Sequence, residues 1–174
     1  MSNLLKSAQE KLTLKVITLR DSNINFNTDF ECDFRDVLPH SFQTFDGVKS
    51  CNETEFSPVE EDEEGFYQYK FLFASGIRVL DEDSSPEDSE DEDTQELEIE
   101  DEPLVIAEIK AIFEAVYDSN EKLSVEEVQA FGDSNVAFNV WPFWREYVQS
   151  SCMRMNIKPI SLPFKMASKK SNKE

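Results

Sequence analysis

The stretch Asn139–Val148 reads NVWPFWREYV and holds both tryptophans of the chain. Its apolar side chains recur at the three- and four-residue spacing of one helical face, and the recurrence continues to Met155. Asn139 is a favourable N-cap, and Pro142 then falls in the first turn, where its missing N–H does little harm. Asn156 suits the left-handed position after a helix. The sequence therefore predicts an amphipathic helix whose apolar stripe is wide enough to serve the core and a second surface.

Four segments before this helix have the composition of β-strands. They span residues 12–20, with an extension through Ile24 and Phe26, and residues 48–56, 66–80 and 104–117. The first shifts phase near Val16 or Ile17, which indicates a β-bulge. The third alternates strictly and has an aromatic face, and Gly76 within it predicts a bulge or a close backbone approach. The third and fourth segments read as an antiparallel pair.

Two helices follow the strands. Ser124–Glu127 reads SVEE, a capping box that predicts a short helix ending at Gly132, and the tryptophan helix comes next. This order predicts an α+β fold, a four-stranded antiparallel sheet with two C-terminal helices packed on one face. We expect a single domain over residues 12–164, between a flexible N-terminus at residues 1–11 and a flexible basic tail at residues 165–174.

The net charge of −20 is concentrated in two acidic runs. Residues 60–64 are all acidic, and residues 81–102 hold 14 further acids with no Lys or Arg. The rest of the chain is nearly balanced, so the acidity describes two loops. Residues 81–102 have the composition of a disordered insertion between the third and fourth strands. The run is either a solvated loop or the docking segment of an acidic adaptor or decoy that binds a basic partner.

Few residues could support catalysis or a metal site. His40 is the only histidine, the four glycines form no phosphate-binding loop, and the clustered carboxylates lie where no fixed geometry is expected. The cysteines lack CxxC spacing and read as free thiols of a reducing compartment; they are Cys32, Cys51 and Cys152. No run approaches the roughly 20 apolar residues of a membrane span. We expect a cytoplasmic protein without enzymatic activity, metal, cofactor or nucleic-acid partner.

The segment between the first two strands is rich in phenylalanine. Its apolar members are Phe30, Phe34, Val37, Leu38, Phe42 and Phe45. A connection normally avoids so many aromatic rings. They either cover the core as a lid or line an exposed groove.

The order of elements and the C-terminal block resemble the SecB family of protein-export chaperones. The resemblance covers about residues 12–162 and is most specific at Trp141–Glu146 and Pro159–Leu162, which match the family's aromatic-Pro-aromatic-x-Arg-Glu pattern and its Pro-Leu tail. It implies an ATP-independent holdase assembled as a homotetramer, a dimer of dimers. Such a chaperone binds unfolded clients in long apolar grooves and hands them to an export motor (SecA-like).

The resemblance also implies where the groove lies, between the connection after the first strand and the main helix. The implied wall residues are Phe30, Phe34, Leu38, Phe42 and Phe45, with Trp144 and Val148 on the helix side. Two departures weigh against delivery to the usual export motor. The connection between the third and fourth strands is long, and lysines follow the Pro-Leu segment in place of an amphipathic helix. Some relatives serve toxin–antitoxin systems, where the client is a labile antitoxin, and this is the alternative function.

Overall fold

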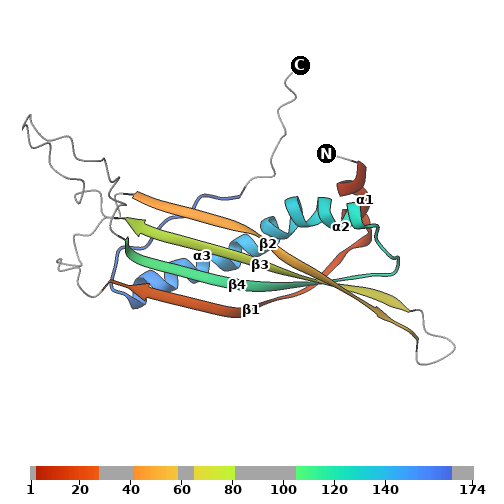
Figure 1. The fold of residues 1–174 in the computed structure, drawn as a ribbon, viewed down its shortest axis with the longest axis horizontal. Helices are drawn as coiled ribbons and strands as arrows, with labels where there is room; N and C mark the ends of the chain where they lie inside the picture. Colours follow the sequence, from red (N-terminus) through yellow and green to blue (C-terminus); the bar gives the residue numbers. More distant parts are fainter. Residues whose placement is uncertain (1–2, 28–40, 59–64, 81–104, 166–174) are drawn as a thin grey trace, which may run out of the picture.

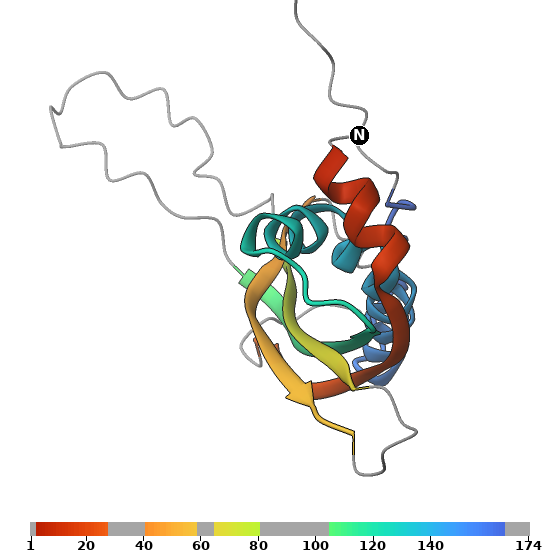
Figure 2. The ribbon, with the colours of Figure 1, turned by 90° about the vertical axis from the view of Figure 1, so that its right-hand side faces the viewer.

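A computed structural model describes residues 3–27, 41–58, 65–80 and 105–165. The elements in chain order are α1 (Asn3–Lys11), β1 (Thr13–Phe26), β2 (Ser41–Phe56), β3 (Phe66–Leu80), β4 (Val105–Ser119), α2 (Val125–Phe131), a π-helical turn η1 (Gly132–Val136) and α3 (Ala137–Arg154). The strands form one antiparallel sheet in the order β1-β4-β3-β2, so β1 and β2 are its edges (Figure 1). Figures 1 and 2 show α3 running along the sheet, with α1 and α2 at one end.

The central strands β3 and β4 form the floor of the core. On the face that the helices cover, each row is a pair of residues opposite each other on β3 and β4. Three rows pair two residues of the same type, and they alternate with three rows in which β4 contributes alanine. The identical pairs are Tyr69–Tyr117, Phe73–Phe113 and Ile77–Ile109; the others are Phe71–Ala115, Ser75–Ala111 and Val79–Ala107. All twelve residues are at most 4% exposed. The predicted strand at residues 66–80 is confirmed in its bounds and in its buried face, and the smaller rows leave space for side chains of the covering helix.

Helix α3 and the chain after it complete the core. Val140, Trp144, Val148 and Cys152 are at most 1% exposed, as the predicted amphipathic stripe requires. Residues 157–165, which we call the C-terminal strap, turn back along the helix after Asn156, whose φ of 56° confirms the predicted left-handed position. Within the strap, Ile157, Ile160 and Leu162 are 3–6% exposed, so the predicted Pro-Leu segment belongs to the core.

The junction between α2 and α3 differs from the prediction. Gly132 has right-handed helical angles and opens η1, which runs directly into α3. The α-helical hydrogen bonding of α2 ends at Phe131 with Gly132 as the C-cap, as predicted, but the chain stays helical there instead of turning left-handed. Asn139 is therefore not an N-cap: its Nδ2 donates to the Tyr117 hydroxyl at 2.9 Å. Pro142 lies inside α3 and leaves the carbonyl of Phe138 without a helical N–H donor.

The strand bounds also differ in two places. β2 begins at Ser41, seven residues before the predicted strand, and so includes Phe42, Phe45 and Gly47. β1 has register shifts at Lys15 and Arg20, the first of them one residue before the predicted bulge. Alternation in the sequence is interrupted at both sites, because each bulge reverses the face of the residues that follow.

The N-terminal segment is a helix and not a flexible tail, which corrects the prediction for residues 3–11. Ala8 of α1 is fully buried, and polar contacts fix the rest of the helix. Gln9 Nε2 donates to Asn135 Oδ1 at 2.7 Å, while Ser7 and Lys11 reach Glu127. The sequence shows only two leucines here, so composition alone misses a helix that is fixed by its partners. The predicted insertion at residues 81–102 and the tail from residue 166 lie outside the described residues.

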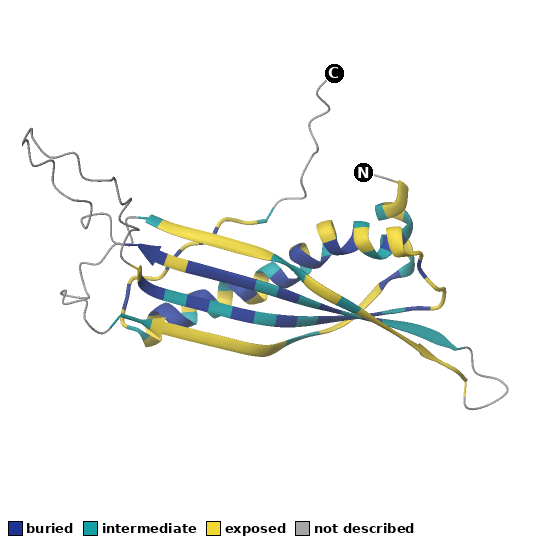
Figure 3. Ribbon diagram, in the orientation of Figure 1, coloured by how far each residue is buried: buried dark blue, intermediate teal, exposed yellow. Residues whose placement is uncertain are grey.

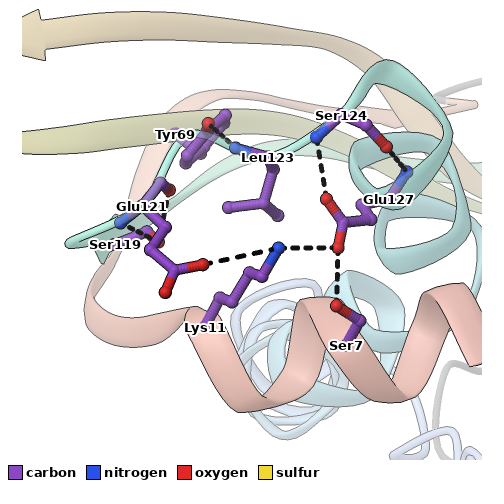
Figure 4. A network of polar contacts seen from close by, with 8 residues as sticks. All are labelled: Ser7, Lys11, Tyr69, Ser119, Glu121, Leu123, Ser124 and Glu127. Carbon is purple, nitrogen blue, oxygen red and sulfur yellow. Dashed lines mark hydrogen bonds and ion pairs between the residues drawn. The ribbon is translucent and has the colours of Figure 1, made fainter.

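Glu127 joins α1 to α2 (Figure 4). Its Oε2 accepts from the backbone N–H of Ser124 at 2.8 Å, and Ser124 Oγ accepts from the Glu127 N–H at 3.2 Å, which confirms the predicted capping box. Its Oε1 accepts from Ser7 Oγ at 2.6 Å and from Lys11 Nζ at 2.9 Å. The hydrogen bonds from Ser7, Ser124 and Lys11 favour the ionised carboxylate and lower the pKa of Glu127 to about 2.

Glu127→Gln should lower the free energy of unfolding by about 1–2 kcal/mol at pH 7, because it weakens the cap and the ion pair together. The folded pKa of Glu127 lies below its usual 4.5, so the stabilisation is present above pH 4.5 and is lost as the pH falls toward 2. Urea unfolding of both proteins at pH 7 and pH 3 measures this difference, which should shrink at the lower pH. Glu126→Gln, one residue away on the exposed side of α2, is the control. Equal losses in the two variants would contradict the assignment.

Candidate functional site

The structure brings only part of the predicted groove to the surface. Phe30, Phe34 and Leu38 lie outside the described residues. Phe42 and Phe45 lie on edge strand β2 and are 43% and 45% exposed. Figure 3 shows that this exposure is general for the edge strands, which are largely exposed beside the buried central strands.

Trp144 and Val148 do not line a surface, which corrects their predicted place on the helix side of a groove. They are 1% and 0% exposed and belong to the hydrophobic core. The rings of Trp144 and Tyr147 are stacked, with 6.2 Å between their centroids. Trp141 stands about 60° away around an ideal helix and is half-buried. The sequence places both tryptophans on one broad stripe, but their separation is too small to tell which one faces the sheet.

Phe42 and Phe45 point to opposite faces of the sheet. Phe42 pairs with Val79 and so shares the helix-covered face, whereas Phe45 pairs with Gly76 on the other face. A Cβ added to Gly76 would stand 2.0 Å from Phe45 Cζ, so the ring rests directly on the glycine. The register has no bulge here, and the predicted close approach at Gly76 is made by this ring. Edge strand β2 therefore offers an aromatic side chain on each face.

The C-terminal strap borders β2 on the helix-covered face. Trp141 Nε1 donates to the carbonyl of Pro163 at 2.7 Å, and the Arg145 guanidinium lies 4.1 Å from the centroid of the Phe164 ring. Lys165 at the end of the strap pairs with Asp46 of β2. Phe164 itself is 79% exposed. We call Phe42, Phe45, Trp141 and Phe164, together with the Asp46–Lys165 pair, the β2 edge surface.

Sequence reasoning missed the strap's share of this surface. Phe164 follows the Pro-Leu segment directly, but no local pattern marks it as an exposed residue. Asp46 likewise carries no signal in the sequence, because its partner Lys165 lies 119 positions away in the chain.

The described part of the chain, which carries the β2 edge surface, has no net charge. The described residues hold 13 Lys and Arg and 13 Asp and Glu, whereas the whole chain has 17 and 37. The net charge of −20 therefore lies wholly outside the described residues. The exposed aromatic rings sit on a neutral body, where charge repulsion would not oppose the approach of an apolar polypeptide.

Two recesses elsewhere on the surface are lined by none of the predicted groove residues. One of about 350 Å³ lies between the end of β1 and the start of β4, near Phe26 and Ile106. The other, of about 330 Å³, has a polar lining that includes Lys11 and Asp118. Within residues 3–27, 41–58, 65–80 and 105–165, no three His, Cys, Asp or Glu side chains gather as metal ligands would. In the same ranges, no helix is both long and apolar enough to cross a membrane.

This architecture is the SecB-like fold. The chain is similar to the solved structure of the SecB-like chaperone Rv1957 of Mycobacterium tuberculosis, in complex with a ChAD peptide from the HigA1 antitoxin Rv1956. The TM-score is 0.58 at 12% sequence identity, over 94% of each chain. The predicted fold class is thereby confirmed. No protein-family model and no curated protein matches the sequence.

The burial of Trp144 and the exposure of Phe42 can be tested through their effects on stability. Trp144→Ala should lower the free energy of unfolding by about 3–5 kcal/mol, because it removes the largest fully buried side chain. Phe42→Ala should lower it by less than about 1 kcal/mol, because the ring is already 43% exposed. Urea denaturation followed by circular dichroism gives both values. Similar losses in the two variants would show that Phe42 is part of the core.

Proposed function

We propose that this protein is an ATP-independent holdase chaperone that binds unfolded or extended client polypeptides. The observation that carries the proposal is the pair of half-exposed phenylalanines on an edge strand of a SecB-like fold. A holdase works by binding alone and needs no nucleophile or metal. It needs exposed apolar surface that offsets the ordering of the client, repeated over several sites.

The proposed binding surface is the β2 edge surface. Phe30, Phe34 and Leu38 remain proposed wall residues, since they precede β2 directly in the chain. A client segment lying along β2 would meet Phe42 on one face and Phe45 on the other. The outer edge of β2 also presents backbone groups that can pair with an extended chain.

The client class has two candidates. The resemblance to export chaperones supports preproteins kept competent for an export motor. The second candidate is a toxin–antitoxin system, in which the client is a labile antitoxin. The structural similarity to Rv1957 favours the second, because that protein was solved with a peptide from an antitoxin. Both clients are unfolded segments, so the same surface serves either.

The acidic residues outside the described ranges supply charge that would keep such an apolar surface soluble. The alternative from another class, an acidic adaptor that binds a basic partner through residues 81–102, predicts a different outcome on deletion of that run. Loss of a partner with retained chaperone activity would support the adaptor, whereas loss of solubility alone would support the solvated loop. The described cysteines, Cys51 and Cys152, are free thiols, which supports a reducing cytoplasmic location.

The first test of the proposal is suppression of aggregation. Light scattering of a denatured client, without ATP, should fall as the protein is added. Phe42→Ser combined with Phe45→Ser should raise the concentration needed for half-maximal suppression by about tenfold or more, because each ring contributes about 1.5–3 kcal/mol when buried.

Gln43→Ser is the matched control, since it changes an exposed residue between the two phenylalanines. Unfolding curves would establish that all variants remain folded. No suppression by the wild type at large excess would refute the holdase proposal.

We also propose assembly as a homotetramer, a dimer of dimers, in which the opposite edge strand β1 forms one of the interfaces. Leu14, Leu19 and Ile24 pair with core-facing residues of β4, yet they are 36–45% exposed. Phe143 lies one turn from Tyr147, which packs against Phe113 of β4, and is 47% exposed. A second copy would cover this apolar edge.

Leu19→Asp should shift the assembly from tetramers toward smaller species, because it buries an unpaired charge in the proposed interface. Size-exclusion chromatography with multi-angle light scattering measures the mass directly. Asn23→Asp introduces the same charge on the other face of β1 and should leave the assembly intact. A wild-type protein that is monomeric at all concentrations would contradict this part of the proposal.

A further inference from the structure

The end of the C-terminal strap occupies a site built by three other elements. Lys165 Nζ lies 4.8 Å from the ring centroid of Trp141 on α3 and 5.9 Å from that of Phe73 on β3. The carboxylate of Asp46 on β2 pairs with the same ammonium group. A carboxylate combined with aromatic rings is an arrangement that proteins use to hold a basic side chain. We call Asp46, Phe73 and Trp141 the Asp46 site.

The Asp46 site is open to solvent on one side. The side chains of Lys165 and Asp46 are 31% and 27% exposed. Water therefore reaches the pair and weakens it relative to a fully buried ion pair. Lys165 fills the site without being sealed in it, so another basic group can compete for the same position.

The strap is held firmly at one end and loosely at the other. Ile160 and Leu162 are each 3% exposed and anchor it in the core. The last three residues are held instead by the hydrogen bond from Trp141 to Pro163, the contact of Arg145 with Phe164, and the ion pair of Lys165. Phe164 is 79% exposed, so its ring loses little burial when this end detaches. Pro163–Lys165 can leave while the anchored part stays in place.

The position of the Asp46 site connects it with the proposed client surface. Asp46 directly follows Phe45 and lies on the same face of β2 as Phe42, as their pairing with Ser75 and Val79 shows. A polypeptide that lies along β2 to reach Phe42 therefore passes Asp46. A basic residue on that polypeptide would meet the carboxylate and the ring of Trp141.

We propose that Lys165 is an internal occupant of a site for a client's Lys or Arg, and that client binding displaces Pro163–Lys165. The partner is an extended polypeptide with a basic residue next to an aromatic one, the same chemistry as the strap's own Phe164–Lys165. This inference rests on the proposed function. Occupation by Lys165 lowers the apparent affinity for the client, which equals the intrinsic affinity multiplied by the fraction of time that the site is vacant. The strap thus raises the client concentration that is needed to fill the site.

The test compares two labelled, unfolded peptides of equal length, both rich in Leu and Phe. One carries Phe-Lys pairs and the other Phe-Glu pairs. Lys165→Ala should bind the Phe-Lys peptide about tenfold more tightly than the wild type does, since the site is then vacant. Its affinity for the Phe-Glu peptide should not increase. Asp46→Asn combined with Lys165→Ala should remove the gain.

Lys158→Ala is the matched control, because it removes an exposed lysine from the same strap and should bind both peptides as the wild type does. Equal binding of the Phe-Lys peptide by Lys165→Ala and Lys158→Ala would overturn the inference and leave the holdase proposal standing. If no variant binds either peptide, both proposals fail. Unfolding curves of the variants ensure that the comparison is made between folded proteins.

Discussion

The main helix α3 is narrower than the four-stranded sheet on which it packs, and the rest of the structure depends on this difference in width. An α-helix with its side chains is about 10–12 Å wide, and neighbouring strands are about 4.8 Å apart. A single helix therefore seals two or three strands and leaves the sheet's margins uncovered. Here the residues of β3 and β4 that face α3 are buried, whereas both edge strands are largely exposed. The two proposed interaction surfaces, β1 for another copy and β2 for a client, are the two edges that α3 does not seal.

The sequence was sufficient for the elements whose pattern is set locally. Strict alternation gave β3 its bounds and its buried face, and the Ser124–Glu127 box fixed the start of α2. Asn156 was identified because few residues adopt a left-handed conformation. In each case the residues that decide the structure lie within a few positions of one another.

The sequence-based predictions were wrong where contacts between residues far apart in the chain determine the local structure. Asn139 looks like a helix cap in the sequence. In the structure its side chain donates a hydrogen bond to the hydroxyl of Tyr117, and the helix begins earlier. The α1 helix has a weak pattern of its own and depends on Glu127, 116 or more positions away. Trp144 and Trp141 share a stripe, and only the placement of α3 on the sheet decides which is buried. The candidate site was half predicted for the same reason: Phe42 and Phe45 were found, whereas the strap's contacts with β2 were not.

The alternating rows of β3 and β4 bear on how this chain keeps its strands aligned. Residues 81–104 connect the two strands, and a connection of this length cannot set the alignment as a tight turn would. The side chains must do so. A slip of two residues preserves the buried face but places Tyr69, Phe73 and Ile77 opposite alanines, which separates all three identical pairs of the native alignment. Because the alignment is encoded in the strands themselves, the connection is free to lengthen, shorten or change its composition over evolution without disturbing the sheet.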